Sequence, residues 1–253
     1  MKWTDFRKVE GRRHQVPLSG TGHTMITPII TAAAPRRADP QAFLAEFMPD
    51  GISAPHFHME HQFQLVVAGG GTIGRKPLRP VSLHYAERKT GYGPITASGE
   101  GLGYLTLRPR SAFGAMVLPE SRSLQRPGEL RRQLTVDLGP CTDALQDEAQ
   151  PHHREVIATT DDGLGAYARW LPANALDQVD GLVDEPVLRG VTQDRYVVVL
   201  TGSVTIEGDE LVPWSCVFAA AGERLPAMRA GAGGAQLLHL QFPASPDDDA
   251  PLQ

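Results

Sequence analysis

The segment QFQLVVAGGGTIG, residues 62–74, decides the fold because a second segment of the chain resembles it. It aligns without a gap with RYVVVLTGSVTIEG, which starts at Arg195, so that Gly69 meets Gly202 at an offset of 133 residues. The same offset aligns two further pairs of segments: RPVSLHY (79–85) with VPWSCVF (212–218), and YLTL (104–107) with LLHL (237–240). Separated segments in one register predict two copies of one structural module.

The repeat also suggests where the modules begin and end. We expect an N-terminal module over residues 1–125, a connection over residues 126–154 and a C-terminal module over residues 155–253. The stretch around the connection is polar and rich in turn-forming residues, as in RPGELRRQ and DLGPCTDALQDEAQPHH, and it is longer than an ordinary hairpin loop.

Short β-branched runs such as FQLVV and RYVVVLTGSVTI are separated by frequent Gly (26) and Pro (21) residues. This pattern predicts an all-β protein. Helical periodicity is scarce, with short candidates near DPQAFLAEF and CTDALQDEA, and the first of these is equally compatible with the start of a strand.

The composition favours a small molecule as the partner. A net charge of -5 gives no electrostatic reason to expect nucleic acid or an anionic membrane. No apolar run approaches the roughly 18 residues of a membrane helix. Cys141 and Cys216 lie far apart, and the start MKWTDFRKVEGRRHQ lacks the apolar segment of a signal peptide, so we expect a cytoplasmic protein.

The stretch PHFHMEHQ, residues 55–62, is the candidate for chemistry. On a strand, His56 and His58 point to the same side and are close enough to share one metal ion. The alternative is that both are solvated histidines at the junction of a loop and a strand. Gln62 follows, and six residues separate it from Gly69.

This order of residues, His56-x-His58, three residues, Gln62, six residues and Gly69, resembles the first motif of the cupin superfamily. Cupins usually have Glu where this chain has Gln62. The second motif of the family, Pro-x-Gly-x-x-His, lacks its histidine, because the corresponding position falls near Gly91 or Tyr92. His84, one strand earlier, is the candidate substitute.

The resemblance implies two antiparallel jelly-roll barrels in tandem, a bicupin, in which only the first barrel carries ligand chemistry. In the second copy, Arg189, Val191 and Arg195 stand at the positions of His56, His58 and Gln62 and cannot form a site for a divalent cation. We therefore expect the second barrel to be structural, to form a dimer or to cover the first. A homodimer is also expected from the resemblance.

Each candidate site residue has an expected role. The metal ligands would be His56 and His58, completed by Gln62 and His84; the catalytic candidates are Tyr92 and Glu60; the substrate-binding candidates are Arg75, Arg108 and Tyr104. Arginine binds a carboxylate at two points, and tyrosine donates to a substrate oxygen. Two alternatives stay open: a solvated turn for Arg75, and a carboxylate ligand from Glu60 if Gln62 does not bind.

The first functional hypothesis is a metal-dependent cupin enzyme that acts on a small organic substrate. Iron(II) is the first ion to consider, followed by zinc, manganese or nickel, because histidine-rich sites bind all of these. A dioxygenase-type oxidoreductase is the commonest reaction that the resemblance implies, and isomerase or lyase chemistry is the next. The second hypothesis is a non-catalytic cupin that binds a small ligand or has a structural role.

Overall fold

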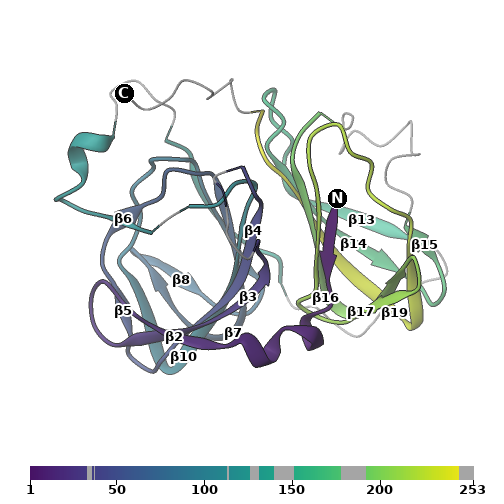
Figure 1. The fold of residues 1–253 in the computed structure, drawn as a ribbon, viewed down its shortest axis with the longest axis horizontal. Coiled ribbons are helices and arrows are strands. Elements are labelled where there is room, and N and C mark those ends of the chain that lie inside the picture. Colours follow the sequence, from purple (N-terminus) through teal and green to yellow (C-terminus); the bar gives the residue numbers. More distant parts are fainter. Residues whose placement is uncertain are drawn as a thin grey trace.

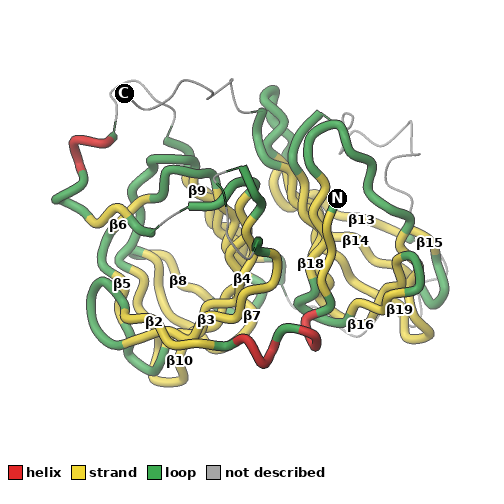
Figure 2. The backbone as a smooth tube through the Cα atoms, in the orientation of Figure 1, coloured by secondary structure: helices red, strands yellow, loops and turns green. Residues whose placement is uncertain are grey.

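The structure is a computed structural model of the protein and describes residues 1–32, 36, 38–112, 114–125, 131–139, 151–177 and 192–244. The described part consists of antiparallel strands and turns with three short 3₁₀ helices, Phe6–Lys8, Glu10–Arg12 and Arg122–Leu124 (Figure 2). The predicted all-β class is confirmed, and the segment that was compatible with helix or strand forms a strand. None of the described helices has the length and apolar character needed to cross a membrane.

The first sheet has nine strands, of which seven follow the order β12-β9-β7-β10-β4-β3-β2, while β5 pairs with β10 and β8 with β7. Its strands are β2 His14–Pro17, β3 His23–Ile30, β4 Gln41–Phe47, β5 Ile52–Ser53, β7 Gln62–Ile73, β8 Lys76–Leu78, β9 Ser82–Ala86, β10 Ile95–Arg108 and β12 Gln133–Asp137. A separate pair, β6 His56–Phe57 and β11 Met116–Val117, lies beside it.

The second sheet has eight strands, of which six follow the order β1-β18-β16-β19-β14-β13, while β15 pairs with β19 and β17 with β16. Its strands are β1 Lys2–Thr4, β13 His152–Ile157, β14 Gly165–Leu171, β15 Leu176–Asp177, β16 Arg195–Ile206, β17 Asp209–Leu211, β18 Cys216–Ala219 and β19 Met228–Gln241. Figure 1 shows the two sheets side by side.

The internal repeat appears as repeated strands. β7, β8 and β10 have the same lengths as β16, β17 and β19, and each pair starts 133 residues apart, at residues 62 and 195, 76 and 209, and 95 and 228. The pairing is repeated as well, because β7 lies between β9 and β10 as β16 lies between β18 and β19. A tandem jelly-roll arrangement stays a prediction.

Two strands pair with a sheet that their position in the chain does not suggest. β1, at the N-terminal end, lies against the second sheet (Figure 1). It pairs with β18, so that Trp3 lies opposite Val217. β12, from the predicted connection, pairs with β9 of the first sheet. Cys141, Arg189 and Val191, together with the helical candidate CTDALQDEA, lie outside the described residues.

The side chains of the central strands alternate between two faces, as the period of two requires. On β7, Phe63 and Leu65 enter a hydrophobic core that also contains Tyr196 and Val198 of β16, so the two sheets pack against each other there. Gln62 and Gln64 project from the opposite face of β7, on the inner side of the first sheet. The alternation therefore separates packing residues from candidate site residues.

A glycine is required at the bend of each long strand. Gly202 has φ +69, and a Cβ atom there would lie 2.1 Å from the backbone oxygen of Gly234; Gly69 has φ +63 and the same contact with Gly101 at 2.2 Å. A left-handed conformation is costly for any residue with a Cβ, and here the obstacle is backbone that belongs to the neighbouring strand.

We therefore expect Gly202→Ala to lower the free energy of unfolding by about 2–3 kcal/mol, measured by denaturant unfolding. Gly233→Ala is the matched control, because Gly233 is exposed and no atom lies within 4 Å of the position that a Cβ would take there. Equal stability of the two variants would contradict the proposed role of the bend.

Candidate functional site

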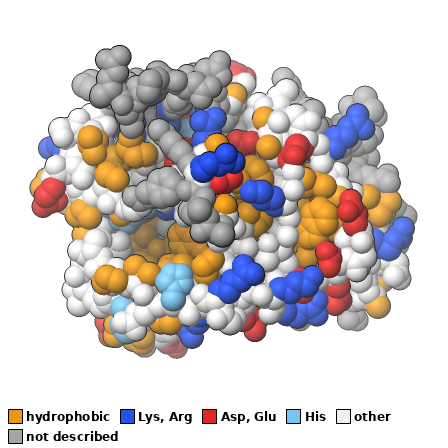
Figure 3. Space-filling model, viewed as in Figure 1, with side chains coloured by type: hydrophobic (Ala, Val, Ile, Leu, Met, Phe, Trp, Pro, Cys, Tyr) orange, Lys and Arg blue, Asp and Glu red, His pale blue; other side chains and the backbone are white. Residues whose placement is uncertain are grey.

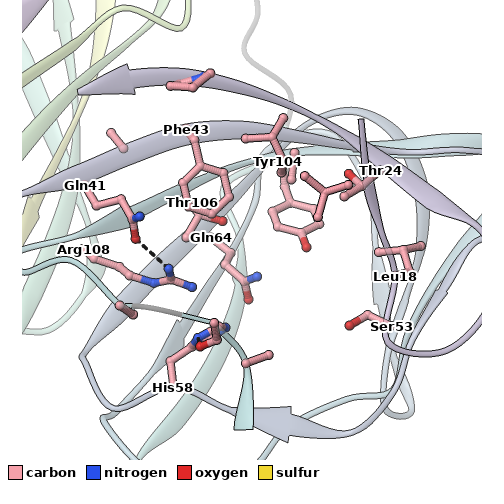
Figure 4. Close-up of a pocket in the computed structure, with 18 of the residues that line it drawn as sticks. Leu18, Thr24, Gln41, Phe43, Ser53, His58, Gln64, Tyr104, Thr106 and Arg108 are labelled. Atoms are coloured by element: carbon pink, nitrogen blue, oxygen red, sulfur yellow. Dashed lines mark hydrogen bonds between the residues drawn. The ribbon is translucent and has the colours of Figure 1, made fainter. Parts of the chain in front are cut away.

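A cavity of about 410 Å³ lies on the inner face of the first sheet. Figure 3 shows hydrophobic side chains around a hollow in this half of the molecule, and Figure 4 shows the cavity itself. Its walls come from β2, β3, β4, β7 and β10 and from the segments that contain His56 and Gly114. The polar side chains at one end are Gln41, His58, Gln64 and Arg108.

His56 and His58 lie next to each other at this cavity, with ring centroids 5.2 Å apart. The Nδ1 atom of His56 lies 2.6 Å from the carbonyl oxygen of Ala54, and that of His58 lies 2.8 Å from the carbonyl oxygen of Gly114. A carbonyl only accepts, so each Nδ1 carries the proton and each Nε2 keeps a lone pair. Histidines that bind a metal through Nε2 have this arrangement.

The two imidazoles are neutral. Burial lowers the pKa of His56, and burial together with the charge of Arg108 holds the pKa of His58 well below its usual value. A neutral imidazole is the form that binds a metal.

Gln62 lies behind the cavity wall, and both the nitrogen and the oxygen of its side-chain amide are hydrogen-bonded. Its Nε2 donates to the hydroxyl of Tyr92, and its Oε1 accepts from Nε and Nη2 of Arg108, at 3.1 and 2.9 Å. Tyr92, near the position expected for the histidine of the second cupin motif, lines the cavity with its ring centroid 4.6 Å from that of His56. Gln62 therefore positions Tyr92 and Arg108.

His84 is buried on β9, and its Nδ1 lies 2.9 Å from the hydroxyl oxygen of Thr135. Its ring centroid is 5.4 Å from that of Tyr92, but it does not line the cavity. The structure therefore brings His84 next to Tyr92 and does not bring it to the cavity surface with His56 and His58.

The other predicted residues divide into two groups. Tyr104 and Arg108 line the cavity, as substrate-binding residues must. Glu60 is buried close enough for its charge to raise the pKa of Arg108, although it does not line the cavity. Arg75 is exposed in the turn between β7 and β8 and is not brought to this cluster.

The sequence reasoning missed several polar residues of the cavity: His14, Gln41, Gln64 and Thr106. Gln64 follows Gln62 by two residues on β7, so the alternation of a strand could have identified it. Gln41 and Thr106 belong to β4 and β10, and only the pairing of those strands brings them to the cavity.

Two of the predicted ligands, His56 and His58, are suited to bind a divalent ion. His56 and His58 present the correct tautomer, whereas the oxygen of Gln62 is occupied by the guanidinium of Arg108. Within the described ranges, no group of three or more His, Cys, Asp or Glu side chains could hold a metal ion. The remaining coordination positions of an ion at this pair would belong to water or a bound ligand.

Comparisons with known proteins identify the fold. A putative dioxygenase from Nostoc punctiforme is 12% identical, with a TM-score of 0.65, over 97% of this chain and 87% of that one. Oxalate decarboxylase of Bacillus subtilis, whose Mn(II) centres have been studied, is 10% identical, with a TM-score of 0.54, over 94% and 77%. The 11S globulin from Wrightia tinctoria, which has an auxin binding site, is 10% identical, with a TM-score of 0.57, over 96% and 83%.

These neighbours have the cupin fold, and the resemblance inferred from the motif is confirmed at the level of the fold. No protein-family model and no curated protein sequence matches the chain.

Proposed function

From the cupin fold and its cavity, we propose that this chain is a metal-dependent enzyme that acts on a small organic molecule. The observation that carries the proposal is the pair His56 and His58, whose Nδ1 protons are held by carbonyl oxygens. These two residues would hold a divalent transition metal, with iron(II) the first ion to test and manganese, zinc and nickel the others. The ion would supply Lewis-acid or redox chemistry.

Tyr92 is the candidate for proton donation. Burial raises the pKa of Tyr92 to about 12, so the phenol keeps its proton at neutral pH. Its oxygen already accepts from Gln62, which orients the hydroxyl and leaves the O–H available to a substrate oxygen. Tyr104, also in the cavity wall, is the second candidate for binding a substrate oxygen.

Dioxygenase-type oxidation is the reaction class to assay first, supported by the likeness to the putative dioxygenase. Isomerase or lyase chemistry is the other class, since the Mn(II) neighbour is a decarboxylase.

A non-catalytic small-ligand-binding protein is the second candidate. The commitment of Gln62 to Tyr92 and Arg108 favours it, because only two protein ligands then remain for an ion. The auxin binding site of the 11S globulin shows that a neighbour of this fold binds a small molecule.

We also propose that the chain comprises two jelly-roll modules, residues 1–125 and 155–253, joined by residues 126–154, and that the second module is structural. Arg195, which stands at the position of Gln62 in that module, is buried, and its Nη2 donates to the carbonyl oxygen of Glu223 at 2.6 Å. A homodimer and a cytoplasmic location remain predictions.

Metal titration separates the two functional candidates. We expect the protein to bind one equivalent of iron(II), manganese or zinc under reducing conditions, and His56→Ala and His58→Ala each to weaken binding by more than about 100-fold. His23→Ala is the control, because His23 belongs to the same sheet and does not line the cavity. Calorimetry measures all four proteins.

Two outcomes would reject the metal-dependent enzyme. The first is no binding of any of these ions by the wild-type protein. The second is equal binding by the two cavity variants and the His23→Ala control, which would place the ion elsewhere.

A further inference from the structure

Arg108 is a buried cation at the polar end of the cavity, with only 4% of its surface exposed. Its guanidinium donates through Nε and Nη2 to Gln62 and through Nη1 to Gln41 at 2.7 Å (Figure 4). Both acceptors are neutral amide oxygens. A guanidinium has five N–H donors, so one donor on each terminal nitrogen is left for a ligand.

Among the described residues, no side chain in the cavity wall neutralises this charge. The described residues that line it include neither aspartate nor glutamate, and its buried histidines and tyrosines are neutral. Glu60, behind the wall, contributes through space, yet burial is the stronger influence and lowers the pKa of Arg108. Burying a cation without a hydrogen-bonded anion is costly, so an anion in the cavity would offset that cost.

Gln64 supplies a second contact next to Arg108. It lies across from Thr106 on β10, two residues before Arg108, and its side chain points into the cavity (Figure 4). Its Oε1 is buried and has no hydrogen-bond partner among the described residues. A hydroxyl or amino group on a ligand would satisfy this oxygen.

The rest of the wall is mainly apolar and comes from residues such as Ile26, Phe43, Phe47 and Tyr104. A volume of about 410 Å³ admits a molecule with an aromatic or branched aliphatic body.

We propose that the cavity binds a small organic carboxylate whose carboxylate pairs with Arg108, whose adjacent hydroxyl or amino group donates to Gln64, and whose body is aromatic or branched aliphatic. This inference rests on the proposed function only in taking the cavity as the ligand site. Arg108 binds the carboxylate, so recognition of the carboxylate does not require the metal.

Binding of mandelate and of mandelamide, its neutral analogue, tests the inference. Binding is measured on the full chain as isolated and again after treatment with EDTA. In both cases we expect mandelate to bind at least roughly tenfold more tightly than mandelamide, which corresponds to one charge-assisted hydrogen-bonded pair. Gln62→Glu and Gln41→Glu each place a carboxylate on Arg108 with little change in volume, and both should abolish the preference. Gln133→Glu, at an exposed position of β12, adds the same charge and should retain it.

Equal affinity for the two compounds, no measurable binding of mandelate, or a preference that survives in both Arg108-directed variants would overturn the inference. The inference would also be overturned if EDTA removed the preference for mandelate, because the metal would then be what binds the carboxylate. A protein that binds no metal but selects mandelate would reject the metal-dependent enzyme and retain the carboxylate site.

Discussion

Replacement of Asp177 by alanine is expected to lower the free energy of unfolding by about 3–5 kcal/mol. Asp177 is fully buried in the second sheet, where one carboxylate oxygen lies 2.5 Å from Nε of Arg169 and the other 3.1 Å from Nε2 of His239. Removing the carboxylate takes away a negative charge that lies against the buried guanidinium of Arg169, which is far more costly than losing an exposed pair.

Denaturant unfolding of Asp177→Ala and of Glu46→Ala compares the loss of a buried carboxylate with the loss of an exposed one. Glu46 pairs with Arg13 at the surface, at 2.9 Å, and its loss should change stability by less than about 1 kcal/mol. The double variant Asp177→Leu with Arg169→Met should be more stable than Asp177→Ala, because an apolar pair of similar volume leaves no buried charge. Similar losses for Asp177→Ala and Glu46→Ala would contradict this account.

The cluster around Asp177 also explains how the two repeats differ. On β14 and β19, Tyr167 lies opposite His239, just as Phe43 lies opposite Thr106 on β4 and β10. Phe43 and Thr106 line the cavity of the first sheet. In the second sheet the same positions hold a stacked pair, with ring centroids 4.5 Å apart, next to the ion pair of Asp177. This supports the proposed structural role of the second module.

Two buried histidines, His61 and His84, are expected to contribute a loss of about 4 kcal/mol of stability between neutral pH and pH 5. Burial lowers the pKa of His61 and of His84 from 6.5 to about 3. At these two positions the unfolded chain therefore binds protons below pH 6.5 that the folded protein excludes. The stability that these groups contribute is complete above pH 6.5 and falls as the pH decreases toward 3.

Unfolding by guanidinium chloride at pH 8, 6.5 and 5, with a chelator present, measures this loss. The double variant His61→Phe with His84→Asn should lose less stability between pH 8 and 5 than the wild type. His14→Ala, an exposed position, should behave as the wild type. Asp162 does not affect the comparison, because Arg132 lowers the pKa of Asp162 to about 2. The contribution of Asp162 to stability therefore changes only below about pH 4. An identical loss in the double variant and the wild type would exclude these histidines as the cause.

The sequence alone determined the class of the fold and the repeat. Alternating apolar residues and positive-φ glycines are local properties of the backbone, so the match of Gly69 with Gly202 already located the same bend in β7 and β16. The spacing of His56 and His58 likewise placed both imidazoles at one cavity, because residues two apart on an extended segment share a side.

Only the tertiary structure decided which groups those residues meet. Gln62 appeared in sequence as a metal ligand, yet Arg108, forty-six residues later, takes its oxygen. Gln41, from a third strand, binds the same guanidinium. The tertiary structure also decided which strands cross between the sheets, namely β1, which pairs with β18, and β12, which pairs with β9. Strand period depends on neighbouring residues, whereas hydrogen-bond partners depend on which distant strands pair, and no local pattern encodes that choice.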